Sequence, residues 1–208
     1  MRKKIDMETS LLQNITHTYS YEEYKNMVIK YAEEYATSGE QLKERIAATL
    51  INAQRMKRID KQCIINYNLH TLISQINRKQ KWLLISESWC GDSAQCVPVI
   101  AKMAELNKNI KLEIVFRDEN IDLMDNFLTN GSRSIPKLIC LDEETDEIKF
   151  MWGPRPKSIQ DKVSELKKNI PEITHDELVK NIHLWYAQDK TKSIQSEFIE
   201  LLNKLNFG

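Results

Sequence analysis

The apolar positions of the chain follow two spacings, one typical of strands and one typical of helices. Short apolar runs and alternating patterns at 82–85, 111–117, 137–141 and 148–152 predict four strands. Between and around them, apolar residues recur every three or four positions, which predicts amphipathic helices. Strands that alternate with helices and then close in a hairpin indicate an α/β fold with a central mixed sheet.

Two helical patterns form a predicted N-terminal extension over residues 1–61. Ser20 and Glu23 have the spacing of a capping box, and the helix after them carries an apolar face that reaches Tyr35. A second helix is predicted from about residue 40 to residue 58. Each helix has one apolar face, so we expect the hairpin to pack on the core.

Residues 62–170 form the predicted central domain, and residues 171–208 a C-terminal helical tail. A helix over 68–78 leads into the first strand, and Thr174 and Glu177 form a second capping box in the tail. Large apolar residues are concentrated in the tail. They either pack on the domain or supply a face for a homodimer.

Composition narrows the class of protein. The chain has 208 residues, a formal net charge of zero, 41% hydrophobic and 29% charged residues, as in an ordinary globular protein. Neutral charge argues against a nucleic-acid partner, and no apolar run approaches the ~20 residues of a membrane span. The basic start lacks the apolar stretch of a secretory signal, so we expect a cytoplasmic protein. The cysteines are then expected to be free, with no metal site and no cofactor.

The most informative stretch is Ser86–Pro98, where the first predicted strand gives way to a helix. Cys90 falls at the helix start, where free N–H groups and the positive end of the helix dipole favour a thiolate. Trp89 and Gly91 suggest a half-exposed sulfur and a close backbone approach. Asp92 opposes the thiolate. Cys90 is the candidate nucleophile, and the alternative is an inert cysteine.

The Trp-Cys-Gly motif around Cys90 resembles the active site of the thioredoxin family. Pro98 stands eight residues after Cys90, where thioredoxins carry a proline that bends this helix. Ile135 and Pro136, before the third strand, look like the family's cis-proline loop, and Gly153 is similar to the glycine that faces the active site. The resemblance covers about residues 62–170, or half the chain, and implies a thioredoxin-like fold.

The resemblance also implies a chemistry, namely thiol–disulfide exchange by Cys90. Its partner would be a disulfide-containing protein or a small thiol such as glutathione. Ile135 and Pro136 would offer a backbone edge to an extended substrate. Trp89 and Gly91 would border that substrate beside the sulfur.

The motif departs from the family at the second cysteine, because Ser93 stands in its place. Ser93 is a candidate hydrogen-bond donor to the sulfur, or a helix cap. Cys96 lies six residues after Cys90, about 9 Å along a helix, whereas disulfides need Cα atoms within roughly 7 Å. Cys96 is therefore either a resolving thiol reached through a distorted helix or a core residue. Leu84 occupies the place of the family's buried acid, with Glu87 nearby.

Other interpretations remain open. The fold could serve as a binding module that uses the proline edge without redox chemistry. Cys-Gly-Asp-Ser is also similar to the Cys-Gly-Phe-Ser of monothiol glutaredoxins, which bind an iron–sulfur cluster. Arg55, Arg58 and Lys61 lie in a segment that resembles one found in a subgroup of bacterial thioredoxin-like proteins. They either form a solvated face or hold an anionic substrate, and Arg155 is either near the site or a surface charge.

Overall fold

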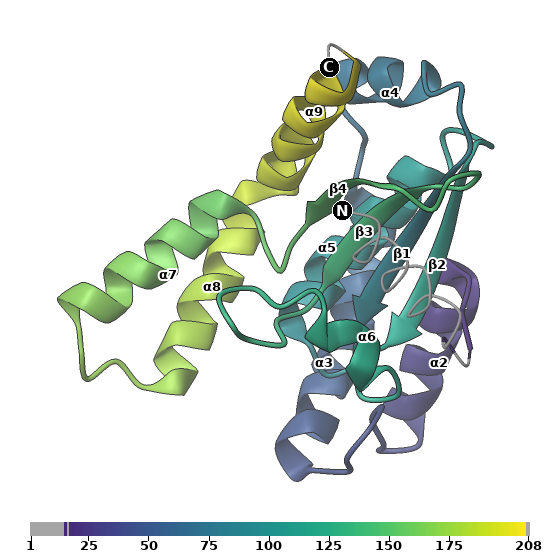
Figure 1. The fold of residues 1–208 in the computed structure, drawn as a ribbon. Coiled ribbons are helices and arrows are strands. Elements are labelled where there is room, and N and C mark those ends of the chain that lie inside the picture. Colours follow the sequence, from purple (N-terminus) through teal and green to yellow (C-terminus); the bar gives the residue numbers. More distant parts are fainter. Residues whose placement is uncertain (1–14, 16, 207–208) are drawn as a thin grey trace.

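A four-stranded mixed sheet forms the centre of the molecule in the computed structural model, which describes residue 15 and residues 17–206 (Figure 1). The strands are β1 (Gln80–Ser86), β2 (Ile110–Phe116), β3 (Lys137–Asp142) and β4 (Ile148–Trp152). They lie in the order β2-β1-β3-β4, with β1 and β2 parallel and the other pairs antiparallel. The prediction of an α/β fold with a mixed sheet is confirmed.

Helices flank the sheet. Their bounds are α2 (Tyr21–Glu33), α3 (Lys43–Gln62), α4 (Tyr67–Ser74), α5 (Gly91–Ala104), α6 (Ile121–Asp125), α7 (Lys157–Asn169), α8 (His175–Asp189) and α9 (Lys192–Asn206). In Figure 1, α7 and α8 form an antiparallel pair that extends from the β4 side, and α9 continues to α4. None of these helices is both long and apolar enough to cross a membrane.

Side chains of β1 alternate between two apolar clusters, one on each face of the sheet. Trp82 and Leu84 join the larger cluster, to which α2–α5 and α7–α9 contribute. Leu83 and Ile85 join the smaller cluster, which α6 and the Ile135 loop cover. Both faces are buried, which explains why β1 reads as a continuous apolar run. The C-terminal helices share the larger core with the sheet.

Several helix ends differ from their predicted positions. Helix α2 ends at Glu33, and Tyr35, expected on its apolar face, is 74% exposed with a positive φ of 51°. Helix α3 runs to Gln62, so the expected domain boundary after residue 61 falls inside a helix. The helix predicted over 68–78 is the shorter α4. Both predicted capping boxes are present, and residues 1–14 of the predicted extension lie outside the described residues.

Candidate functional site

The thiol of Cys90 lies between the start of α5 and the loop before β3. Cys90 is the N-cap of α5, and its Sγ accepts the Ser93 N–H at 3.4 Å. The thiol donates to the carbonyl oxygen of Ile135 at 3.3 Å. The Ile135–Pro136 peptide bond is cis. The structure thus brings Cys90, Ser93, Ile135 and Pro136 together.

Burial keeps this thiol protonated. Cys90 is only 9% exposed, which corrects the expectation of a half-exposed sulfur. Desolvation raises its pKa to about 11, and the carboxylate of Asp92 adds to the rise, while the Ser93 hydroxyl and N–H lower the pKa. The expected preference for thiolate is therefore wrong for the resting protein, because loss of hydration outweighs the favourable helix start.

Gly153 fixes the loop that faces the thiol. Its φ is +115°, and a Cβ there would lie 2.1 Å from the carbonyl oxygen of Pro136. A side chain cannot be accommodated without moving the backbone of the loop. Glycine at this position therefore allows the end of β4 to pack directly against Pro136.

Trp89 packs between two guanidinium groups. Arg45 lies 4.5 Å and Arg117 4.8 Å from its ring centroid. Both arginines pair with Asp118, at 3.1 Å and 2.7 Å respectively. On this side of Cys90 two guanidinium groups thus share one carboxylate, and the tryptophan between them is half-buried.

A buried polar network holds the turn between β1 and α5. Glu87 accepts the N–H of Asp118 at 2.8 Å and the hydroxyl of Ser38. Ser88 also accepts the N–H of Ser38 at 2.9 Å, and its carbonyl oxygen accepts the amide of Asn52 at 2.9 Å. Burial raises the pKa of Glu87. Residues from the hairpin of α2 and α3 therefore help to position Cys90.

Asp92 joins α5 to the C-terminal part of the chain. One carboxylate oxygen accepts a hydrogen bond from the Tyr186 hydroxyl at 2.7 Å. The other forms an ion pair with Arg155. Desolvation raises the pKa of Asp92, and Arg155 and Tyr186 oppose that rise. Arg155, which the sequence left open as a surface charge, is thus tied to the first turn of α5.

Cys96 and Cys90 lie in different apolar clusters. Cys96 is 1% exposed in the larger apolar cluster, whereas Cys90 belongs to the smaller one. Its Sγ lies 3.6 Å from the Tyr186 hydroxyl, and burial raises its pKa well above the ordinary value. All four cysteines are free. Cys140 is buried, with a pKa raised to about 12, and Cys63 is partly exposed.

His183, on α8, covers Gly91. A Cβ on Gly91 would lie 2.7 Å from the His183 ring and 3.6 Å from Arg55 Nη1. Burial, and then Arg55 and Arg155, lower the pKa of His183 to about 4. Sequence reasoning missed both His183 and the site role of Tyr186. The sequence places both residues on a helix of the tail, beside its apolar stripe. That pattern does not indicate which surface of the domain the helix covers.

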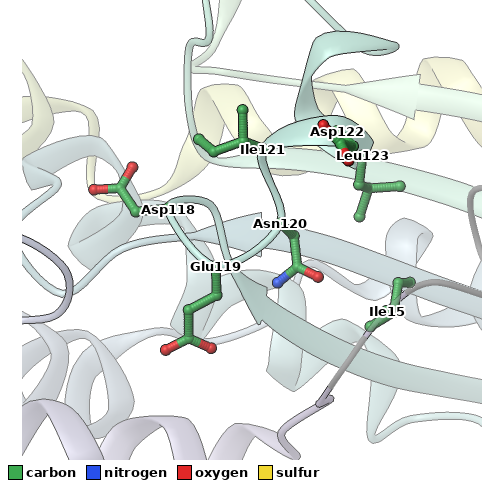
Figure 2. Close-up of a pocket in the computed structure, with 7 residues that line it drawn as sticks. All are labelled: Ile15, Asp118, Glu119, Asn120, Ile121, Asp122 and Leu123. Atoms are coloured by element: carbon green, nitrogen blue, oxygen red, sulfur yellow. The ribbon is translucent and has the colours of Figure 1, made fainter.

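A cavity of about 260 Å³ lies beyond the end of β2 and does not include Cys90. Figure 2 shows its lining, the Asp118–Leu123 segment with Ile15, in which carboxylates predominate over other polar groups. The described residues contain no group of three or more His, Cys, Asp or Glu side chains that could hold a metal ion.

Comparison with known families identifies the class of this protein. A family model described as thioredoxin matches residues 39–167, more than half of the chain, so the chain belongs to the thioredoxin family. The match begins before α3, which places that helix within the family region. The resemblance drawn from the sequence began only at residue 62.

Two solved structures share the fold at low sequence identity. A protein of unknown function, PA1234 from Pseudomonas aeruginosa, is 17% identical with a TM-score of 0.56, and the match covers 89% of this chain and 98% of that one. An HIV epitope-scaffold is 16% identical with a TM-score of 0.52, and the match covers 89% and 99% of the two chains. A search of curated proteins found no match.

Proposed function

We propose that this protein is a thiol–disulfide oxidoreductase with Cys90 as its nucleophile. The supporting observation is the position of the Cys90 thiol, which lies at the start of α5 and contacts the carbonyl oxygen of Ile135. A substrate in extended conformation that pairs with the backbone at Pro136 brings its own disulfide beside this sulfur. Trp89 and Gly91 border the same position.

The reaction is exchange between one thiolate and one disulfide. Cys90 Sγ attacks a substrate sulfur, the Sγ–S bond forms, the substrate S–S bond breaks, and the leaving thiolate takes up a proton from solvent. Ser93 cannot resolve the mixed disulfide, and Cys96 lies against Tyr186. A second thiol, from a small molecule or a partner protein, therefore attacks the mixed disulfide and restores Cys90.

The raised pKa gives this proposal a distinct kinetic signature. A thiol with a pKa of about 11 is ionised in only about one molecule in 10⁴ at pH 7. The rate of attack should then rise about tenfold per pH unit through the neutral range. A substrate that displaces the Ile135 contact and admits water would lower the pKa of the Cys90 thiol and so speed its ionisation.

A binding module remains the second candidate, supported by the buried and protonated state of Cys90. In that case the edge at Pro136 would hold an extended peptide, and the thiol would be part of the core. The two candidates differ in what the sulfur contributes, so replacing it separates them.

The test is turnover of bis(2-hydroxyethyl) disulfide in the presence of excess small thiol. Cys90→Ser is expected to reduce the catalysed rate to background. Cys96→Ser and Cys63→Ser, which retain Cys90, are expected to keep most of it. A Cys90→Ser variant that is folded and as active as the wild type would exclude the redox proposal and favour the binding module.

A further inference from the structure

Arg55 is a half-buried cation whose position is fixed. Its Nη1 donates to the side-chain oxygen of Asn52 at 2.8 Å, and Asn52 is fully buried. The guanidinium group is thereby held against Gly91, the residue after Cys90. Arg55 makes no salt bridge with any described residue.

Positive charge exceeds negative charge around Arg55. Arg155 and Arg58 bond to Asp92 and Gln95 in the first turns of α5. After burial, they lower the pKa of His183 together with Arg55. Within residues 17–206, these three arginines form one ion pair, between Arg155 and Asp92. A partly desolvated guanidinium without a counter-ion is costly. Arg55, half-buried and in no ion pair with a described residue, therefore indicates a place for an anion beside Gly91.

Buried polar atoms without partners mark the same region. His183 Nδ1 and Arg155 Nε are both inaccessible and make no hydrogen bond with any described residue. Buried polar groups are normally satisfied by protein, water or ligand, so these two atoms of His183 and Arg155 point to a bound group.

The other side of Cys90 differs in charge. There Arg45 and Arg117 share Asp118, and the buried carboxylate of Glu87 lies close by. Arg55, which pairs with no described carboxylate, thus lies on the Gly91 side of Cys90, where His183 of α8 packs. Consecutive Cα atoms are ~3.8 Å apart, so an anion bound at Gly91 is within the reach of one short molecule attached to Cys90.

We propose that Arg55, Arg58 and Arg155, together with His183, bind the carboxylate of a small disulfide or thiol that reacts with Cys90. This cluster is called the anion subsite below. The inference rests on the proposed exchange reaction and names its substrate class. A small ligand is favoured over a broad protein surface, because His183 covers Gly91 and Cys90 is only 9% exposed.

The anion subsite holds one half of a symmetrical disulfide during exchange. Cys90 Sγ bonds to the sulfur of that half, the S–S bond breaks, and the other half leaves as a thiolate that takes a proton from solvent. The retained half keeps its carboxylate at the arginines. A second small thiol then attacks, forms a new small disulfide and regenerates the Cys90 thiolate.

The test compares three disulfides of similar size and different charge. They are 3,3′-dithiodipropionate, bis(2-hydroxyethyl) disulfide and cystamine, which are anionic, neutral and cationic. The rate of mixed-disulfide formation on Cys90 is measured by mass spectrometry. We expect the anionic compound to react about tenfold faster than the neutral one, equivalent to about 1.4 kcal/mol. The preference should weaken as salt is raised.

Arg55→Gln is the decisive variant, and Lys57→Gln its matched control. Lys57 lies on the same helix but is exposed, so its replacement removes the same charge outside the subsite. Arg55→Gln is expected to bring the anionic-to-neutral rate ratio close to one, whatever its effect on the neutral rate. Lys57→Gln should keep the ratio of the wild type. Equal loss in both variants would show a general charge effect and overturn the anion subsite.

A non-reactive anion separates the subsite from the redox chemistry. Suberate, which matches the anionic disulfide in length, is titrated into Cys90→Ser by calorimetry, with and without Arg55→Gln. Binding that Arg55→Gln abolishes supports the subsite even if Cys90 reacts with no disulfide. Reaction of Cys90 with all three disulfides at equal rates, and no suberate binding, overturns the subsite and leaves the oxidoreductase proposal standing. Neither reaction nor binding overturns both.

Discussion

Replacement of Asp92 by asparagine should make Cys90 more acidic and the protein less stable. Asp92 is a buried carboxylate whose charge raises the pKa of Cys90, second only to desolvation. An asparagine side chain at this position would have nearly the same shape but no charge. The thiolate of Cys90 would then lose an unfavourable neighbour, so its pKa should fall.

The structure bounds the size of both effects. Burial and Asp92 together lift the pKa of Cys90 from the ordinary value of 9.0 to about 11, and burial is the larger cause. Removing the charge should therefore lower the pKa by less than burial raises it. The same change leaves Arg155 without its ion-pair partner and weakens the bond from Tyr186. Because Arg155 is partly exposed, we expect a loss of about 2–3 kcal/mol, below the roughly 3–5 kcal/mol of a fully buried pair.

The assay is the rate of Cys90 alkylation between pH 7 and pH 11, with the modified residue identified by mass spectrometry. The midpoint should move to lower pH in Asp92→Asn and stay unchanged in Asp122→Asn, where an exposed acid on α6 is neutralised. Urea denaturation supplies the stability of each variant. A midpoint that stays or rises in Asp92→Asn, in a protein that remains folded at pH 7, would refute the assigned coupling.

Two further predictions concern the frame around the site. Gly153→Ala should lower the free energy of unfolding by about 3–5 kcal/mol in urea denaturation, because its φ is +115° and the added Cβ would lie 2.1 Å from the Pro136 oxygen. Gly131→Ala, at φ +75° with open space, should lower it by only about 1–2 kcal/mol. Equal losses would contradict the packing argument. The pKa of His183 is about 4 in the folded protein and 6.5 ordinarily. Between pH 6.5 and pH 4 the unfolded chain therefore binds one more proton than the folded protein, and stability should fall as the pH drops through this range. His183→Gln should remove about 1–2 kcal/mol of that loss, after allowance for partial exposure, and a variant as sensitive to pH as the wild type would show that His183 is not responsible.

Local sequence patterns predicted the sheet because each strand is defined by nearby residues. The run Trp82–Ile85 is apolar at every position, and β1 is buried on both faces. The capping boxes at Ser20 and Thr174 were equally local, since both partners lie within one turn of helix. Tyr35 was misplaced because its spacing continued the apolar face after the helix had ended.

The candidate site was predictable only where the family motif defines it. Cys90, Ile135 and Pro136 meet as the thioredoxin pattern implies, but the protonation state of the thiol depends on burial, which no motif encodes. The helix start alone suggested the opposite direction of pKa shift. His183 and Tyr186 could not be placed, because the contact of α8 with α5 spans about 90 residues of chain.

The most direct test of the account is to find which sulfur forms the first mixed disulfide. The wild type, Cys90→Ser and Cys96→Ser would each be treated with bis(2-hydroxyethyl) disulfide at pH 8, and the adduct located by peptide mass spectrometry. We predict an adduct at Cys90 that forms faster at higher pH, persists in Cys96→Ser and is absent from Cys90→Ser. An adduct confined to Cys63, with Cys90 unmodified in the folded protein at pH 8 and above, would contradict a nucleophilic role for Cys90.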